Sequence, residues 1–157
     1  MTAAGGYGQN PERAVGVATA GIGGRAVARF IDWIIAGIVG GIVFWVLDRV
    51  ADLPGWVEIL PGAGFGFLYF VFFEVISGAT PGKRVLGLQV NGADGAEKPS
   101  VQESAKRNAY MLFNLIPWIG GVLWFFSAIA IAVTVSASST KQGWHDNFAG
   151  GTRVVKD

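Results

Sequence analysis

The sequence predicts an all-α membrane protein: a bundle of three to four transmembrane or re-entrant helices with a short cytoplasmic two-stranded β element. Of its 157 residues, 52% are hydrophobic and only 15% are charged. This leaves too little polar surface for a soluble domain of this length. The mean hydropathy is +0.46. No Lys, Arg, Asp or Glu occurs in residues 33–47, 59–73 or 108–140, and roughly 20 mostly apolar residues cross the hydrocarbon core of a bilayer.

The first two spans are predicted at residues 26–47 and 57–76. The polar sequence DRVADLPG separates them, and its Pro-Gly pair is typical of a turn. Residues 1–24 are rich in Gly and Ala and have too little apolar surface to fold by themselves. We therefore expect a flexible N-terminal tail followed by one membrane domain, residues 25–157.

A polar connector, residues 77–100, is expected to follow the second span. Its sequence RVLGLQV has apolar residues at alternate positions, a pattern that predicts a short strand. The C-terminal segment, residues 138–157, contains TRVV, which resembles a strand that could pair with it. Ser100 and Glu103 have the spacing of a capping box, so a helix should begin near residue 101.

The apolar run after the connector allows two topologies. One longer third span would place the C-terminus opposite the connector, whereas a hairpin of residues 101–116 and 121–137 would return it to the connector's side. The hairpin leaves Arg49 alone on one side and eleven Lys and Arg residues on the other; the single span gives a division of eight and four. Because cytoplasmic loops carry an excess of Lys and Arg, we favour the hairpin, with both termini cytoplasmic.

The head of the first span carries two opposite charges one turn apart. On a helix, one face would hold Arg25, Arg29, Asp32, Ala36 and Gly40. A charge at the centre of a span costs roughly 2.5–3.5 kcal/mol. Either Arg29 neutralises Asp32 locally and fixes the depth of the helix, or this face points into the bundle. In the second case both side chains join a polar cluster that is structural or forms an ion or ligand pathway.

Further polar residues are expected on the same side of the membrane. The supporting candidates are Arg25, Glu74, Lys83, Arg84 and His145. Glu74 ends the second span, within reach of Lys83, Arg84 or Arg29. We expect His145 to be a satisfied interfacial group rather than a proton shuttle or ligand. Without a second His or any Cys, no metal site is expected.

Small residues in the first span predict helix packing. Gly37 and Gly41 form a G-x-x-x-G pair, and Ala36 and Gly40 lie on the charged face. Such positions let helices approach closely, within one chain or between chains. Besides the lipid bilayer, the expected partners are therefore further copies of the chain or other membrane proteins.

Several function classes find no support. The net charge of +1 and the absence of a basic stripe argue against a nucleic-acid partner. The sequence GATPGKR lacks the spacing of a phosphate-binding loop. We find no nucleophile–base pair and no cofactor motif, so neither an enzyme nor a bound cofactor is expected.

Three sequence blocks resemble the signatures of the RDD family of bacterial membrane proteins. They are RAVARFIDWII, SGATPGKRVLGLQVNGADG and HDNFAGGTRVV, and the resemblance extends from Arg25 to Val155. It implies that the family's arginine and two aspartates fall on Arg29, Asp32 and Asp146. It also implies a multi-pass protein of the bacterial inner membrane. The family is associated with transport, including sodium–proton exchange, and some members are accessory parts of larger membrane systems.

Two functions remain open from the sequence. In the first, Asp32, balanced by Arg29 and approached by Asp146 or Glu74, would bind a proton, small cation or other small solute. A few short helices leave little room for two gates, so this transporter would require a homo-oligomer. In the second, the chain is a non-transporting accessory or scaffold subunit of a larger complex, and the charged cluster locks the connector and C-terminal strand in place.

Overall fold

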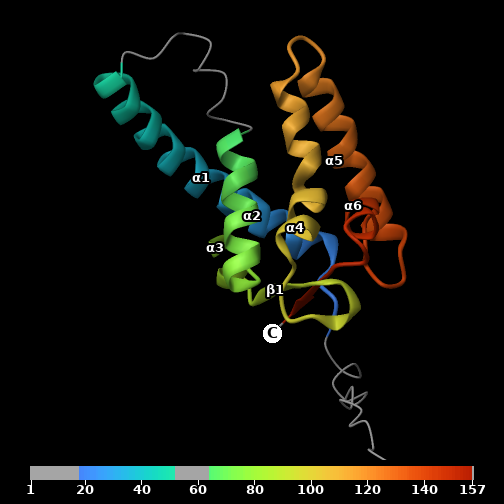
Figure 1. Cartoon of the computed structure of the whole chain (residues 1–157). Helices are drawn as coiled ribbons and strands as arrows, with labels where there is room; N and C mark the ends of the chain where they lie inside the picture. Colours follow the sequence, from blue (N-terminus) through green and yellow to red (C-terminus); the bar gives the residue numbers. More distant parts are fainter. Residues whose placement is uncertain (1–17, 52–63, 157) are drawn as a thin grey trace, which may run out of the picture.

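A computed structural model describes residues 18–51 and 64–156, and these are mostly helical (Figure 1). In chain order the elements are α1 (Ile22–Ala51), α2 (Gly66–Ser77), α3 (Pro81–Val85), β1 (Leu88–Asn91), the 3₁₀ turn η4 (Ala93–Gly95), α4 (Val101–Asn108), the 3₁₀ helix η5 (Ala109–Leu115), α5 (Gly120–Ala137), α6 (Trp144–Phe148) and β2 (Arg153–Lys156).

Two helices, α1 and α5, are long and apolar enough to cross a membrane. Their most apolar 18-residue windows have mean hydropathies of 2.2 and 1.9, and only 17% and 11% of each window is buried inside the protein. Large apolar side chains on both helices therefore face outward, which is stable in lipid. The first helix is longer than the predicted 26–47. Where the span 57–76 was predicted, the structure has α2, a shorter apolar helix of 12 residues, and residues 57–63 lie outside the described chain.

The segment after the connector folds back on itself. α4 and η5 form one arm, and α5 returns beside them (Figure 1). The two arms approach closely at Gly120, where a Cβ atom would lie 2.1 Å from the carbonyl oxygen of Phe113. The predicted arms, 101–116 and 121–137, correspond to these segments. The capping box at the start of α4 is present: Ser100 accepts a hydrogen bond from the Glu103 amide, and the Glu103 carboxylate accepts one from the Ser100 amide.

The predicted two-stranded element is confirmed. β1 and β2 pair antiparallel, with Val90 opposite Val154. Thr19 forms a further bridge with Val155 on the other side of β2, and the Ala20 amide donates to the Val154 carbonyl. Residues 1–17 of the expected tail lie outside the described residues, whereas residues 18–24 make these backbone contacts and begin α1 at Ile22.

Two apolar clusters meet at α1. The first lies around the sheet and contains Ala20, Ala28, Leu88, Val90 and Val154. The second lies between the helices and contains Ala36, Tyr69, Phe70, Tyr110 and Met111. Between Ala28 and Ala36, on the same buried face of α1, lies Asp32. A carboxylate is therefore placed at the junction of the two clusters.

Candidate functional site

Asp32 is fully buried and accepts hydrogen bonds from two neighbouring elements. Tyr69 of α2 donates its hydroxyl to Oδ1 at 3.0 Å, and the Gly82 amide donates to the same oxygen at 2.7 Å. The Thr80 hydroxyl donates to Oδ2 at 2.5 Å. The Gly82 amide is available because the first amides of a helix have no partner within the helix. Asp32 thus ties α1 to α2 and to the start of α3.

The contact between α1 and α3 requires a glycine. A Cβ atom at Gly82 would lie 2.3 Å from the carbonyl oxygen of Ala28 and 2.9 Å from Cγ of Asp32. Pro81, at the first turn of α3, fixes its own φ near the helical value and lacks the amide that would otherwise be unpaired there. The sequence TPGK therefore provides one hydroxyl and one amide for Asp32 and the space for two helices to touch.

The structure has no local ion pair between Arg29 and Asp32, because Asp32 faces the bundle and Arg29 points elsewhere. Among the described residues, neither side chain takes part in an ion pair. The Arg29 guanidinium lies 4.0 Å from the ring centroid of Phe70. Both of its terminal nitrogens lie 3.4 Å from Oδ1 of Asn108, which is a long hydrogen bond.

Glu74 is the centre of a second buried group. Its Oε1 forms an ion pair with Lys83, as the sequence allowed. Its Oε2 accepts hydrogen bonds from Ser104 at 2.8 Å and from Asn108 at 3.0 Å, and Arg107 Nε lies 3.9 Å from Oε1. Glu74 therefore connects α2 both to α3 and to one face of α4.

Asp146, at the start of α6, is the centre of a third group. Its Oδ2 is 2.9 Å from Arg25 and accepts a hydrogen bond from the Gly143 amide at 3.0 Å. Its Oδ1 is 3.1 Å from Arg107 and 3.4 Å from the Thr152 hydroxyl. Burial alone would raise the pKa of Asp146, but Arg107 and Arg25 outweigh it and hold that pKa well below its usual value.

Arg107 joins the second and third groups, because it is buried between Glu74 and Asp146. Arg25 also donates to two backbone carbonyl groups, of Ala20 at 3.1 Å and Lys141 at 2.5 Å. These contacts connect the first turn of α1 to the C-terminal segment. Together, the three carboxylates tie α1, α2, α3, α4 and α6 into one polar network at the sheet end of the bundle.

His145 is buried within the protein. Burial lowers the pKa of His145 to about 3, so the ring is neutral. Its Nε2 lies 3.5 Å from Oδ1 of Asp146, but its Nδ1 has no hydrogen-bond partner among the described residues. The prediction of a satisfied group is wrong at that atom, because Nδ1 packs against the Cα of Gly143, where a Cβ would lie 2.7 Å away.

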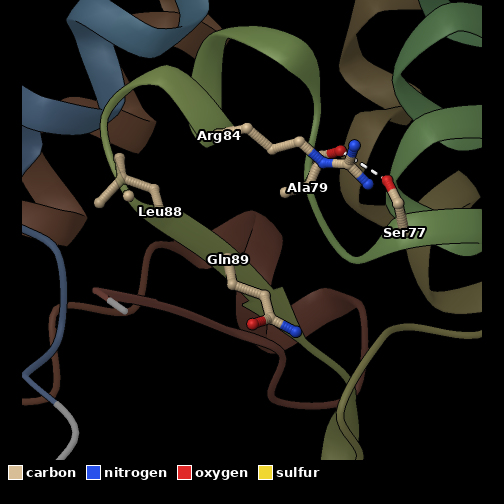
Figure 2. Close-up of a pocket in the computed structure, with 6 residues that line it drawn as sticks. Ser77, Ala79, Arg84, Leu88 and Gln89 are labelled. Atoms are coloured by element: carbon tan, nitrogen blue, oxygen red, sulfur yellow. Dashed lines mark hydrogen bonds between the residues drawn. The ribbon is translucent and has the colours of Figure 1, made fainter.

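Arg84 lies apart from the network. Arg84 is exposed and lines a small cavity of about 150 Å³ near the start of β1, and Figure 2 shows its side chain there with the other lining residues. Ser77 lines the same cavity, but its hydroxyl is already used: it donates to the carbonyl oxygens of Phe73 and Ala79, both at 2.8 Å. Of the three cations predicted within reach of Glu74, the structure brings only Lys83 into an ion pair with it.

The predicted packing residues divide between two environments. Ala36 and Gly40 are buried, and a Cβ atom on Gly40 would lie 3.0 Å from the Phe65 ring. Gly37 and Gly41 are exposed, and a Cβ atom on either would meet nothing within 4 Å. All four line an apolar cavity of about 330 Å³ between α1 and α2.

Sequence reasoning missed several members of the network. They are Tyr69, Thr80, Gly82, Ser104, Arg107 and Asn108. One pattern could have found three of them: Ser104, Arg107 and Asn108 have the i, i+3, i+4 spacing of a single helix face. In the described part of the chain, no group of three or more His, Cys, Asp or Glu residues could hold a metal ion.

Comparison with known proteins identifies the family. No match was found among curated proteins or among solved structures. A model of the RDD family matches residues 19–150, which cover most of the chain and contain the three buried carboxylates. With its two membrane-length apolar helices, this is a membrane protein, and the chain belongs to the RDD family.

Proposed function

We propose that this chain is a non-enzymatic scaffold or accessory subunit. Its helices dock in the membrane against other membrane proteins, and its polar end forms a preformed platform at the membrane surface. The observation that carries the proposal is the saturation of the buried carboxylates. Every oxygen of Asp32, Glu74 and Asp146 has at least one donor from the chain itself.

Because every carboxylate oxygen already has a donor, these acids are better suited to a structural role than to an ion pathway. A carried ion must exchange its ligands as the site opens to each side, whereas these acids hold five helices together through partners far apart in sequence. Removing one partner of a buried ion pair destabilises a protein by roughly 3–5 kcal/mol. A network of this kind is suited to fixing the relative positions of helices.

The outward-facing apolar surface supports docking in the membrane. On α5, Phe125 and Phe126 are 55% and 63% exposed. Aromatic side chains contribute strongly to interfaces between proteins. Lipid would cover them in the isolated chain, and another helix could do so in an assembly.

The distribution of charge supports a cytoplasmic position for the polar end, in a bacterial inner membrane. Among the described Lys and Arg residues, Arg49 alone lies at the far end of α1. The others belong to the beginning of α1, the connector, α4 and the C-terminal segment. This asymmetry follows the positive-inside rule.

Photocrosslinking in native membranes tests the scaffold role. A photoreactive amino acid at Phe126 should give one discrete adduct with another membrane protein. A matched probe at Asp94, an exposed position in η4, controls for random collision. Adducts from Phe126 that contain only lipid or a second copy of this chain would refute the proposal.

Transport is the second candidate, and one observation favours it. Asp32 is buried with three donors but with no cation in ion-pair range among the described residues. Buried ionisable groups in membranes commonly mark ion pathways. This alternative predicts cation-driven proton flux in proteoliposomes that Asp32→Asn abolishes. The asparagine side chain keeps an oxygen that accepts from the Gly82 amide, and its NH₂ group can donate to the Thr80 hydroxyl oxygen. These bonds should preserve the fold, so a loss of flux would report on the missing carboxylate.

A further inference from the structure

The apolar cavity lies between α2 and α1, a helix long and apolar enough to cross a membrane. It has a volume of about 330 Å³, which falls within the range of small-molecule sites. Residues from α1, from the start of α2 and from η5 line it, among them Trp33, Gly37, Gly41, Phe65, Phe70 and Met111. The glycines leave open space on the α1 side.

Arg29 contacts two of the residues that line this cavity, Phe70 and Met111. Its guanidinium lies 4.0 Å from the ring centroid of Phe70 and 3.9 Å from the sulfur of Met111, and both of these residues line the cavity. Arg29 is half-buried, yet the described chain provides no carboxylate within ion-pair range. Within residues 18–51 and 64–156, its one polar side-chain partner other than the Met111 sulfur is Asn108, at 3.4 Å. An anion could therefore replace this long contact without breaking any ion pair that the described residues form.

We propose that the cavity binds one phospholipid with an anionic headgroup. The phosphate would lie at Arg29, because a guanidinium can donate two parallel hydrogen bonds to phosphate oxygens. An acyl chain would run along the glycine side of α1. From Arg29 to Gly40 the helix rises about 16 Å at 1.5 Å per residue, which leads from headgroup depth into the hydrocarbon.

Competition between two lipids tests this site. The delipidated full chain would be mixed with equal amounts of phosphatidylglycerol and phosphatidylcholine that have identical acyl chains, and native mass spectrometry would count each bound lipid. We expect one site with about a fivefold preference for phosphatidylglycerol, the factor typical of one basic residue near anionic lipid. Arg29→Gln should remove the preference, and Arg29→Lys should keep most of it.

Two further variants separate charge from shape. Arg49→Gln is the matched charge control, since Arg49 lies over Trp45 at the other end of α1, and it should bind as the wild type does. Gly37→Leu should weaken the binding of both lipids, because its side chain would extend into the cavity from a Cβ atom that meets nothing within 4 Å. Far-ultraviolet circular dichroism would check that each variant folds.

Three results would overturn the proposal. The first is a wild-type chain that binds both lipids equally. The second is a preference that persists in Arg29→Gln or disappears equally in Arg49→Gln. The third is a dimer that forms through the Gly37 face and excludes lipid, which would assign the cavity to a second copy of the chain.

Discussion

Replacing Gly82 with alanine should separate α3 from α1. The added Cβ would lie 2.3 Å from the Ala28 carbonyl oxygen, so the two elements must move apart by about 0.7 Å to reach a contact of 3.0 Å. The same shift would lengthen the Gly82 amide–Asp32 hydrogen bond from 2.7 Å to about 3.4 Å, beyond the usual range.

Two costs then add in the free energy of unfolding. Loss of a hydrogen bond to a charged group costs about 1.5–3 kcal/mol. Overpacking of a tight contact costs about 1–3 kcal/mol. We therefore expect Gly82→Ala to lower the free energy of unfolding by roughly 2.5–6 kcal/mol.

Titration with sodium dodecyl sulfate in mixed micelles would measure this loss through the helical signal. Gly121→Ala is the matched control: a Cβ atom there meets nothing within 4 Å, and alanine favours helix more than glycine does, so no loss is expected. Hydrogen exchange at residues 80–85 should rise only in Gly82→Ala. If the two variants unfold within about 0.5 kcal/mol of each other, a typical tolerance for surface changes, the close approach does not hold the helices together.

Three other predictions use the same unfolding assay. Glu74→Gln should cost roughly 3–5 kcal/mol because it leaves Lys83 buried without its ion-pair partner, and adding Lys83→Met should recover part of that loss; no recovery would argue against the pairing. Because the pKa of His145 is about 3 when folded and near 6.5 when unfolded, stability should fall as the pH drops below 6.5, by up to about 1.4 kcal/mol per pH unit. His145→Gln should remove this slope between pH 6.5 and 5, and an unchanged slope would contradict the assignment. Ser100→Ala should cost about 1 kcal/mol through loss of the helix cap, whereas no cost would mean that Glu103 alone holds the start of the helix.

Features set by short-range patterns could be predicted from the sequence. Alternating apolar residues predicted the strand that pairs with β2, and the spacing of Ser100 and Glu103 predicted the capping box. The helical period placed Asp32 on the same face as Ala36 and Gly40, and all three are buried. In each case the pattern repeats within a few residues, so the local backbone geometry determines which side chains lie together.

The partners of the buried acids could not be predicted in the same way. Asp146 pairs with Arg25, which is 121 residues away, and a list of charges does not distinguish Arg25 from Arg29 as its partner. Asp32 is held by two hydroxyl groups and one backbone amide, and none of these appears in a charge pattern. Charge balance suggests that an acid will be neutralised by a cation, but hydrogen bonding to neutral donors satisfied this carboxylate instead.

The position of β2 has a consequence for biosynthesis. This strand lies between β1 and the backbone around Thr19, yet the ribosome makes it after both of them. Until Asp146 is synthesised, Arg25 lacks this ion-pair partner. Until β2 is synthesised, β1 and the backbone around Thr19 lack the strand that lies between them. A chain that stalls before residue 146 would leave Arg25 without this ion pair and would leave β1 and the backbone around Thr19 without the strand between them.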